Sequence, residues 1–385
     1  MVFLKPNTLK ELRKCEICCS SNISSAIGVC AKCLKEKAEM ALPIAIKNQS
    51  STRLSLGLVP FPPKGANGIR CNLCVAECVM GDGDMGYCGI RGNKGGRLFS
   101  LVGKDEALLD FYLDPHVTNC CNAYFCPAGT GCGYPKYSNT KGPEIGYYNL
   151  ALFFYGCSFT CMFCQNWTHK LLGKARRVKM KELIDLTLNN ERISCWCWFG
   201  GSAEPQLPFA IKASKEAYES KRAGRILRIC YEWNGDGNPL LVERALETVL
   251  ESGGNVKFDL KAFNPNIHKA LTGMDNKRVL ENFEMVYRKF WDKRSAFPVL
   301  GATTLLVPNY VDEEEVKNIS NFLSSLDPHI PYNLLVFHPD FMMRDLPITP
   351  LRQVINCFRV AKRNLKRVNV SNLHLLGYPS QLSSL

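Results

Sequence analysis

The chain has 385 residues, 46% of them hydrophobic, and a formal net charge of +13. This length allows one large domain with a sizeable core and a second, smaller one. The chain contains no apolar run of roughly 18 residues or more, which excludes an ordinary membrane-spanning helix. The basic residues are scattered, so the charge favours solvated helix faces over a nucleic-acid footprint, although an RNA partner stays open.

The cysteine content is the unusual feature of the composition. The chain has 20 cysteines, many of them in C-x2-C and C-x3-C spacings. The first residues, Met1 to Asn7, lack the apolar core and the cleavage site of a signal peptide, so we expect a cytoplasmic protein. In a reducing compartment, clustered cysteines favour metal ligation over disulfides.

Residues 1–45 are predicted to form a small cysteine-rich, metal-binding region. Two C-x2-C pairs, separated by 11 residues, consist of Cys15, Cys18, Cys30 and Cys33. Four thiolates suffice for one tetrahedral zinc ion, and such a site has no open position for chemistry, so we expect a structural role. The alternative is two reduced pairs without a metal.

Residues 46–147 are interpreted as a cysteine-rich linker and lead-in segment. Residues 46–66 are rich in Ser, Pro and Gly and predict a linker or surface wrap. Four thiols follow, at Cys71, Cys74, Cys78 and Cys88. They could hold zinc or a second iron–sulfur cluster that relays electrons, and the spacing does not separate these interpretations from a site without metal. Residues 103–147 predict a long loop whose four further cysteines are either ligands or buried apolar residues.

A third cysteine group lies where a buried strand ends. An apolar run at 149–155 predicts the strand. Three cysteines follow it at C-x3-C-x2-C spacing: Cys157, Cys161 and Cys164. Iron–sulfur clusters normally take four cysteines, so three leave one iron without a protein ligand, free to bind and reduce another molecule. The alternative is a structural zinc loop or a chance spacing.

From residue 148 to residue 376 the pattern becomes regular. Short β-branched or aromatic runs predict strands at 149–155, 195–199, 226–232, 255–260, 298–307 and 332–337. Amphipathic helices are predicted between these strands and after the last one, at 180–190, 207–221, 238–251, 277–290, 312–325 and 349–364. Six βα units in a row predict an α/β fold with a parallel sheet and helices outside it. Residues 377–385 are interpreted as a tail.

Polar residues and glycines stand at the predicted strand ends, where (β/α) barrels place their chemistry. The candidates are Gly200, Gly201, Glu204, Glu232, Asn234, Asp259, Lys261 and His338. Glycines let a ligand approach the backbone, and a buried pair of charges such as Asp259 and Lys261 is costly unless it is paired or used. Turns, a surface salt bridge and a hydrogen-bonded structural histidine are the alternatives.

The three-cysteine motif resembles that of the radical S-adenosylmethionine (radical SAM) superfamily. The resemblance implies a partial (β/α)6 TIM-type barrel and a [4Fe–4S] cluster on Cys157, Cys161 and Cys164, with SAM bound to the fourth iron. It further implies that one electron from the cluster cleaves SAM and yields a 5′-deoxyadenosyl radical. Phe163 matches the family's aromatic position near the adenine.

The same resemblance implies cofactor contacts at two strand ends. Gly200, Gly201 and Glu204 resemble the Gly-Gly-Glu-Pro motif that holds the SAM amino group, although this chain has a two-residue insertion. Glu232 and Asn234 resemble a segment of glycyl-radical-activating enzymes, which implies hydrogen bonds to the ribose hydroxyls.

From about residue 67 to 376 the chain is similar to AmmeMemoRadiSam-type proteins, a branch related to pyruvate formate-lyase activating enzymes. The activating enzymes have the same Asp-x-Lys pattern, which implies that Asp259 and Lys261 line the SAM and substrate site. His338 is held extended before a proline at the end of a predicted strand, where it could contact SAM or substrate. A protein substrate and an electron donor such as flavodoxin or ferredoxin are implied too. The alternatives are radical SAM modification of RNA, of a protein side chain or of a small metabolite. Two further alternatives are not enzymes: a non-catalytic metal-binding adaptor and an electron carrier.

Overall fold

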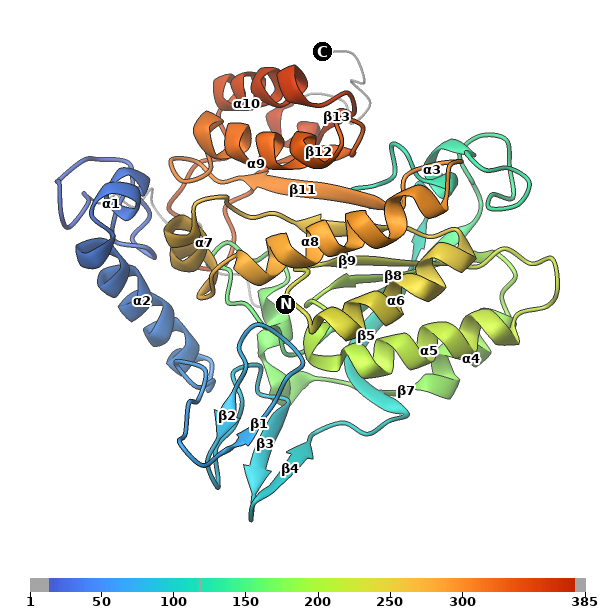
Figure 1. The fold of residues 1–385 in the computed structure, drawn as a ribbon, viewed down its shortest axis with the longest axis horizontal. Coiled ribbons are helices and arrows are strands. Elements are labelled where there is room, and N and C mark those ends of the chain that lie inside the picture. The colour runs from blue at the N-terminus through green and yellow to red at the C-terminus, as the bar shows by residue number, and fades with distance from the viewer. Residues whose placement is uncertain (1–13, 118–119, 378–385) are drawn as a thin grey trace.

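The computed structural model describes residues 14–117 and 120–377, and its centre is one nine-stranded sheet (Figure 1). The strand order is β13-β12-β11-β10-β9-β8-β6-β5-β7. The strands are β5 (Glu106–Pro115), β6 (Tyr148–Phe154), β7 (Arg177–Lys179), β8 (Ile193–Gly200), β9 (Arg228–Trp233), β10 (Val256–Asp259), β11 (Leu300–Leu306), β12 (Tyr332–Val336) and β13 (Val368–Ser371). Neighbours from β6 to β13 pair in parallel, whereas β5 is antiparallel to both β6 and β7.

Helices alternate with these strands and cover the sheet on the side that faces the viewer in Figure 1. They are α4 (Met180–Leu188), α5 (Leu207–Ser220), α6 (Pro239–Ser252), α8 (Lys277–Phe290), α9 (Glu313–Leu326) and α10 (Leu351–Asn364). The six predicted strands and six predicted helices are confirmed, with bounds that differ by about two residues at most. The short helix α7 (Pro265–Thr272) and the strand β13 were not expected.

Local sequence explains the ends of α6. The Asn238 side chain accepts a hydrogen bond from the Leu240 backbone N–H, and Pro239 occupies the first helical position. Gly253 ends the helix in the left-handed conformation, with φ of 78°, as the pair Gly253-Gly254 predicts.

Large apolar side chains form the core between sheet and helices. Trp196, Trp198 and Trp233 are fully buried, and the ring of Phe154 stacks on that of Trp198 with centroids 5.0 Å apart. The indole N–H of Trp198 donates to Ser214 at 2.8 Å, so the buried polar atom is satisfied. The apolar runs that predicted β6 and β8 are therefore core strands, buried on both faces as parallel strands commonly are.

The long loop predicted for residues 103–147 is wrong in its first part, because residues 106–115 form β5. This strand pairs with β6 from Leu109 opposite Phe154 to Pro115 opposite Tyr148. Aspartates at positions 110 and 114 interrupt its apolar pattern, so pairing with β6 overrides a weak local preference. The rest of the segment includes the short helix α3 (Pro127–Thr130).

The linker predicted for residues 46–66 is also wrong in its first part. Helix α2 (Ala38–Ser55) follows α1 (Ala31–Glu36) and continues to residue 55. The hydroxyls of Ser50 and Ser51 both donate to the Lys47 carbonyl at 2.9 Å, so these polar residues are accommodated inside the helix. One buried apolar cluster includes residues of this N-terminal part and of the sheet, so the proposed domain boundaries stay a prediction.

Two small hairpins connect α2 with β5 and lie below the sheet in Figure 1. One pairs β1 (Ile69–Arg70) with β2 (Val79–Met80), and the other pairs β3 (Arg91–Lys94) with β4 (Arg97–Ser100). The part of the chain that the structure describes has no helix long and apolar enough to cross a membrane. The expectation about Met1 to Asn7 and nearly all of the predicted tail lie outside the described residues.

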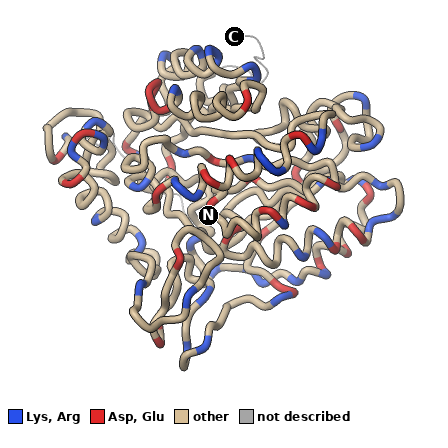
Figure 2. The backbone as a smooth tube through the Cα atoms, in the orientation of Figure 1, with Lys and Arg blue, Asp and Glu red and all other residues tan. Residues whose placement is uncertain are grey.

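Charged residues of both signs are interspersed along the outer helices in the view of Figure 2. Pairs such as Lys181 with Asp185 and Arg288 with Glu284 lie one helical turn apart. This arrangement agrees with solvated helix faces and gives no support to the RNA alternative in the view shown.

Candidate functional site

Three thiols follow the end of β6, at the edge where the parallel strands end: Cys157, Cys161 and Cys164, here called the three-cysteine loop. Backbone hydrogen bonds attach this loop to the end of α7. The Thr160 N–H donates to the Thr272 carbonyl at 2.7 Å, and the Met162 N–H donates to the Leu271 carbonyl at 2.9 Å. The position of the sulfurs is therefore set by the fold and not by a free loop.

Cys161 of this loop is buried and Cys157 and Cys164 are half-buried, with cations nearby. Burial raises the pKa of Cys157, and it raises the pKa of Cys161 to about 12 although Lys261 and Lys170 oppose it. The Asn234 side-chain amide donates to the Cys157 sulfur at 3.4 Å. Ionising several buried thiols together requires compensating positive charge, and iron ions would supply it. The donor set and its surroundings thus fit an iron–sulfur cluster.

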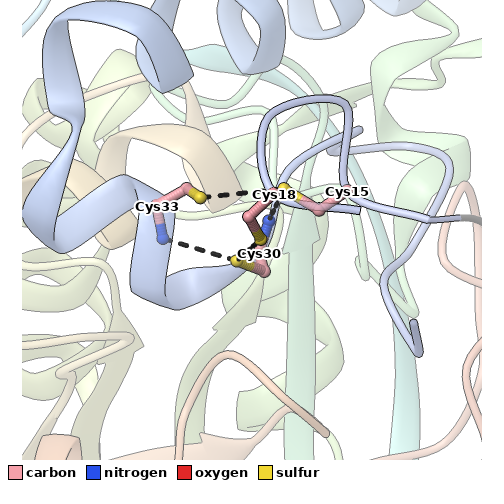
Figure 3. A group of neighbouring side chains, drawn as sticks. All are labelled: Cys15, Cys18, Cys30 and Cys33. Carbon is pink, nitrogen blue, oxygen red and sulfur yellow. Dashed lines mark hydrogen bonds between the residues drawn. The ribbon is translucent and has the colours of Figure 1, made fainter. Parts of the chain in front are cut away.

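The N-terminal thiol group is Cys15, Cys18, Cys30 and Cys33 (Figure 3). Its four sulfurs all lie within 4.8 Å of one another, with Cys15 at 3.8 Å from Cys33 and Cys18 at 3.6 Å from Cys30. Zinc–sulfur bonds of about 2.3 Å in a tetrahedron place the sulfurs about 3.8 Å apart. The group therefore has the geometry of a single tetrahedral ion.

The three-cysteine loop is wider than the N-terminal thiol group. Within residues 14–117 and 120–377, its sulfurs do not form a set that lies within 4.8 Å of one another. A cluster of four irons gives each cysteine its own iron, so the sulfurs stand farther apart than around one ion. The sulfurs of the three-cysteine loop therefore do not surround a single ion, and their wider spacing agrees with a cluster of several irons.

A chain of charged side chains runs beside the three-cysteine loop, and all are buried except the half-buried Asp259. Lys257 lies 3.2 Å from Glu232 and 2.6 Å from Asp259, and Lys261 lies 2.7 Å from Asp259. Burial opposes the ionisation of Asp259, but the two ammonium groups outweigh it and lower its pKa to about 2. The positive charge of Lys261 also favours the thiolate of Cys161, so this charge network acts on one of the three sulfurs.

The glycine-rich end of β8 is shaped by close backbone approach. A Cβ on Gly201 would come 1.7 Å from a carbonyl oxygen at the end of β6, and a Cβ on Gly200 would come 2.5 Å from the ring of Phe153. Glu204 is fully buried, and its carboxylate accepts hydrogen bonds from the Ser202 hydroxyl and from the Gly235 N–H. Glu204 therefore ties the ends of β8 and β9 together, and its contact with the SAM amino group stays a prediction.

Phe163 and His338 are the remaining predicted site residues. Phe163 is buried at 6% exposure within the three-cysteine loop. The imidazole of His338 lies 2.9 Å from the Asp340 carboxylate, and its side chain is 44% exposed. The Met342 N–H donates to the Met162 carbonyl at 3.0 Å, which joins the segment after β12 to the three-cysteine loop. His338 pairs with Asp340 and does not enter the buried charge network.

Sequence reasoning missed three buried cations. Lys257 alternates with Asp259 and Lys261, so their shared face of β10 could have revealed it. Lys170 donates to the Phe159 carbonyl at 3.0 Å. Arg53 of α2, 1% exposed, donates to the Thr160 hydroxyl in the three-cysteine loop. Nothing in the local sequence signals the roles of Lys170 and Arg53, because only the fold brings them to this loop.

The family model of the radical SAM superfamily matches residues 152–323. An isethionate sulfite-lyase activating enzyme of Desulfovibrio desulfuricans is 34% identical over 278 residues, which cover 55% of this chain and 86% of that protein. The chain belongs to the radical SAM superfamily. An uncharacterized protein of Methanocaldococcus jannaschii is 22% identical to this radical SAM protein over 327 residues, covering 80% and 82% of the two chains.

A solved domain of a pyruvate-formate lyase-activating enzyme from Bacteroides vulgatus overlaps 46% of this chain and 98% of its own length. It has 18% sequence identity and a TM-score of 0.36, so the family assignment rests on the sequence matches. Membership makes the protein an enzyme and implies a [4Fe–4S] cluster and SAM, and the three-cysteine loop stays the predicted site of that cluster.

Proposed function

We propose that this radical SAM enzyme abstracts a hydrogen atom from a partner protein, in the manner of a glycyl-radical-activating enzyme. The observation that carries the proposal is the three-cysteine loop, fixed at the strand ends beside the charges of Lys257, Asp259 and Lys261. The name of the 34% identical relative, an isethionate sulfite-lyase activating enzyme, supports a protein substrate. Charged residues of both signs alternate along the outer helices in Figure 2, which favours a protein substrate over RNA.

The cofactors follow from the donor set. Cys157, Cys161 and Cys164 would hold three irons of a [4Fe–4S] cluster, and SAM would occupy the iron that no residue binds. When bound, the reduced cluster would supply one electron to SAM, which would break its sulfonium C–S bond into methionine and a 5′-deoxyadenosyl radical. Phe163 and the tight backbone of Gly200 and Gly201 would shape the SAM site.

The residues of the site would bind and orient SAM and substrate. The pKa of about 2 keeps Asp259 ionised, so its carboxylate can accept hydrogen bonds at any ordinary pH. Lys261 is held by Asp259 and can donate to a carboxylate or a carbonyl. Asn234 donates a hydrogen bond to the Cys157 sulfur, and Glu232 pairs with Lys257. Both residues would therefore position groups of the site.

A glycine in a polypeptide loop fits such a site for chemical reasons. Its Cα–H bond is weak, because the radical is stabilised by the amide groups on both sides. A loop with no side chain at that position could enter the rim, where the half-exposed His338 can donate to or accept from its backbone. The reductant would be a one-electron donor of the flavodoxin or ferredoxin class, and the enzyme would work in the cytoplasm.

For the N-terminal thiol group we propose structural zinc. The group is attached to the catalytic part by several contacts: Asp345 accepts from the Ser24 hydroxyl at 2.8 Å, and the Tyr310 hydroxyl donates to the Val29 carbonyl at 3.0 Å. Zinc bound there would stiffen the start of α1 and, through α2, support Arg53 at the three-cysteine loop.

The proposal is tested with anaerobically reconstituted protein. Full-length enzyme with SAM and dithionite should yield 5′-deoxyadenosine, and a triple Cys157→Ala, Cys161→Ala, Cys164→Ala variant should yield none. With a glycyl-radical enzyme encoded beside this chain, electron paramagnetic resonance should then show a glycyl radical. SAM cleavage without a glycyl signal on any co-encoded partner would refute the protein-activating function and leave the radical SAM chemistry intact.

A further inference from the structure

Two buried cations lie against the three-cysteine loop without a carboxylate partner of their own. They are Arg53 of α2 and Lys170, at the end of a short 3₁₀ helix (Trp167–Lys170), and they are 1% and 3% exposed. We propose that both are fixed counter-ions of the iron–sulfur cluster, which stabilise its thiolate ligands and favour its reduced state. This rests on the cluster of the proposed function and is independent of the protein substrate.

Lys170 contacts the backbone of the three-cysteine loop. Its ammonium group donates to the Phe159 carbonyl at 3.0 Å, and the Phe159 N–H donates to the Cys157 sulfur at 3.4 Å. The His169 carbonyl accepts from the Gly156 N–H at 3.0 Å, which fixes the 3₁₀ helix to the residue before Cys157. A single residue, Phe159, therefore separates the ammonium group from a predicted ligand sulfur.

Arg53 contacts the same loop from 107 residues earlier in the chain. Its guanidinium donates to the Thr160 hydroxyl in the three-cysteine loop, to the Val59 carbonyl at 2.6 Å and to the Tyr87 carbonyl. It also stacks on the Tyr87 ring, with its central carbon 3.3 Å from the ring centre. Arg53 lies outside residues 152–323, which the family model matches, so the N-terminal part of this chain supplies the second cation.

Neither cation has a counter-charge among the residues that it contacts. In residues 14–117 and 120–377, their polar partners are carbonyls, a hydroxyl and the His169 imidazole, whose pKa burial lowers well below its usual value. By contrast, Lys261 beside the same loop lies 2.7 Å from the carboxylate of Asp259. A buried cation is costly without an opposite charge, and the thiolates of the three-cysteine loop would supply it.

The two charges would act on the reduction potential of the cluster. Three thiolates outweigh the positive charge of an oxidised [4Fe–4S] core, so the assembly is anionic, and reduction adds one more negative charge. Between buried groups a cation stabilises an added negative charge more strongly than in water, because the effective dielectric constant is lower. Arg53 and Lys170 should therefore raise the reduction potential, and removal of either charge should lower it.

Arg53 also borders the predicted second metal site. Its partner Tyr87 directly precedes Cys88. The other predicted ligands of that site lie between β1 and β2: Cys71, Cys74 and Cys78. The metal of this site stays a prediction. Both polar partners of Lys170 lie within residues 159–169, so a change of Lys170 isolates the effect on the three-cysteine loop.

Redox titration of the catalytic cluster tests the two charges. Electron paramagnetic resonance follows the signal that the triple Cys→Ala variant of the three-cysteine loop lacks. Lys170→Met removes the charge at similar size and should lower the equilibrium constant for reduction about tenfold, which equals about 59 mV for one electron. Arg53→Gln should act in the same direction, and Arg53→Lys, which keeps the charge, should restore most of the loss. An unchanged potential in either charge-removing variant would overturn the proposal for that residue.

Arg294→Gln is the matched control. Arg294 is buried too, at 8% exposure, and donates to the Gly254 carbonyl at 2.7 Å. It precedes β11, whereas the three-cysteine loop lies where the parallel strands end, so the two are at opposite ends of the sheet's strands. This variant should leave the potential unchanged although it removes a buried guanidinium. A fall as large as that in Arg53→Gln would show a general effect of lost structure and contradict the proposal.

A stability cycle tests the same charges without SAM or activity. The rise in melting temperature when iron-free protein is reconstituted should be smaller in Lys170→Met than in wild type, because the cluster then compensates one buried cation fewer. An equal rise in both proteins would contradict the proposal, and the same cycle with Arg53→Gln decides should Lys170→Met not fold. A wild-type protein that binds no cluster at the three cysteines would instead refute the cluster of the proposed function, and the counter-ions with it.

Discussion

The N-terminal thiol group and the three-cysteine loop use the same side chain in two geometries. In the first, four sulfurs lie within 4.8 Å of one another at the start of α1; in the second, three sulfurs spread around the end of β6 and form no such set. The first fits one closed tetrahedral ion, and the second fits a larger cluster with an open position. We therefore propose that the distance between sulfurs separates a structural centre from a reactive one, which cysteine spacing in the sequence does not do.

The largest expected effect comes from a single sulfur of the reactive centre. Cys161→Ser should abolish 5′-deoxyadenosine formation, because the cluster loses one of only three protein ligands. The zinc content should be unchanged, because the N-terminal thiol group is separate from the loop. Product analysis and metal counting on the same sample check both statements, with Cys357→Ser as a control that alters a distant buried thiol.

The complementary change removes a sulfur of the closed centre. Cys33→Ser should eliminate about one zinc per chain and lower the melting temperature by about 5 °C or more, because metal binding contributes to folding. Iron in the three-cysteine loop should be retained. Cys19→Ser changes an exposed cysteine next to the group but outside it, and should do neither. If this variant lost iron and retained zinc, the assignment of zinc to the N-terminal thiol group would be wrong.

A charge beside the reactive centre can be changed without touching a sulfur. Asp259→Asn leaves the buried Lys257 and Lys261 without their shared carboxylate, and because Asp259 is half-buried the cost should lie below the roughly 3–5 kcal/mol of a fully buried pair. We expect lower stability to urea and a large loss of 5′-deoxyadenosine formation, with zinc unaffected. Asp340→Asn, at a half-exposed pair with His338, should cost less than about 1 kcal/mol.

The same carboxylate predicts a pH dependence. Its pKa is about 2 in the folded protein and about 3.8 when free, so the unfolded state binds more protons between these values. The stabilisation by Asp259 is therefore fully present above about pH 4 and is lost as the pH falls toward 2. Urea unfolding of wild type and Asp259→Asn should give a stability difference that shrinks over this range. A difference that grows on acidification would contradict the charge network.

The smallest expected effect concerns the hydrogen bond to a ligand sulfur. Asn234→Ala removes the amide N–H that lies 3.4 Å from the Cys157 sulfur. The reduction potential of the cluster should fall, and activity should decrease several-fold while the iron content is retained. Redox titration checks the potential. An unchanged potential with unchanged activity would show that the amide does not act on the cluster.

The regular half of the fold could be predicted from the sequence because its strands and helices follow the local hydrophobic period. Each strand from β6 to β12 in the parallel sheet carries an apolar run long enough to be recognised. Strand β5 could not be recognised, since only its pairing with β6 makes a segment containing two aspartates a strand. Helix α2 was not predicted at all, and the serines in its C-terminal part suggested a linker instead.

The candidate site was predictable where its residues follow one another in the chain. The three-cysteine loop and the pair Asp259 and Lys261 are local patterns, and the structure brings them together through Cys161. Arg53 and Lys170 reach the same loop from other segments, so no local pattern could reveal them. Whether four cysteines surround one ion or several likewise depends on three-dimensional distances.

The central claim is that three cysteines hold a cluster whose remaining iron binds SAM. It is tested most directly by pulsed electron paramagnetic resonance of the reduced enzyme with SAM that carries isotope-labelled nitrogen in its methionine moiety. The account predicts a strong coupling between the cluster and that nitrogen, and its absence in the triple cysteine variant. A catalytic cluster ligated by a fourth residue, with no coupling to SAM, would contradict it.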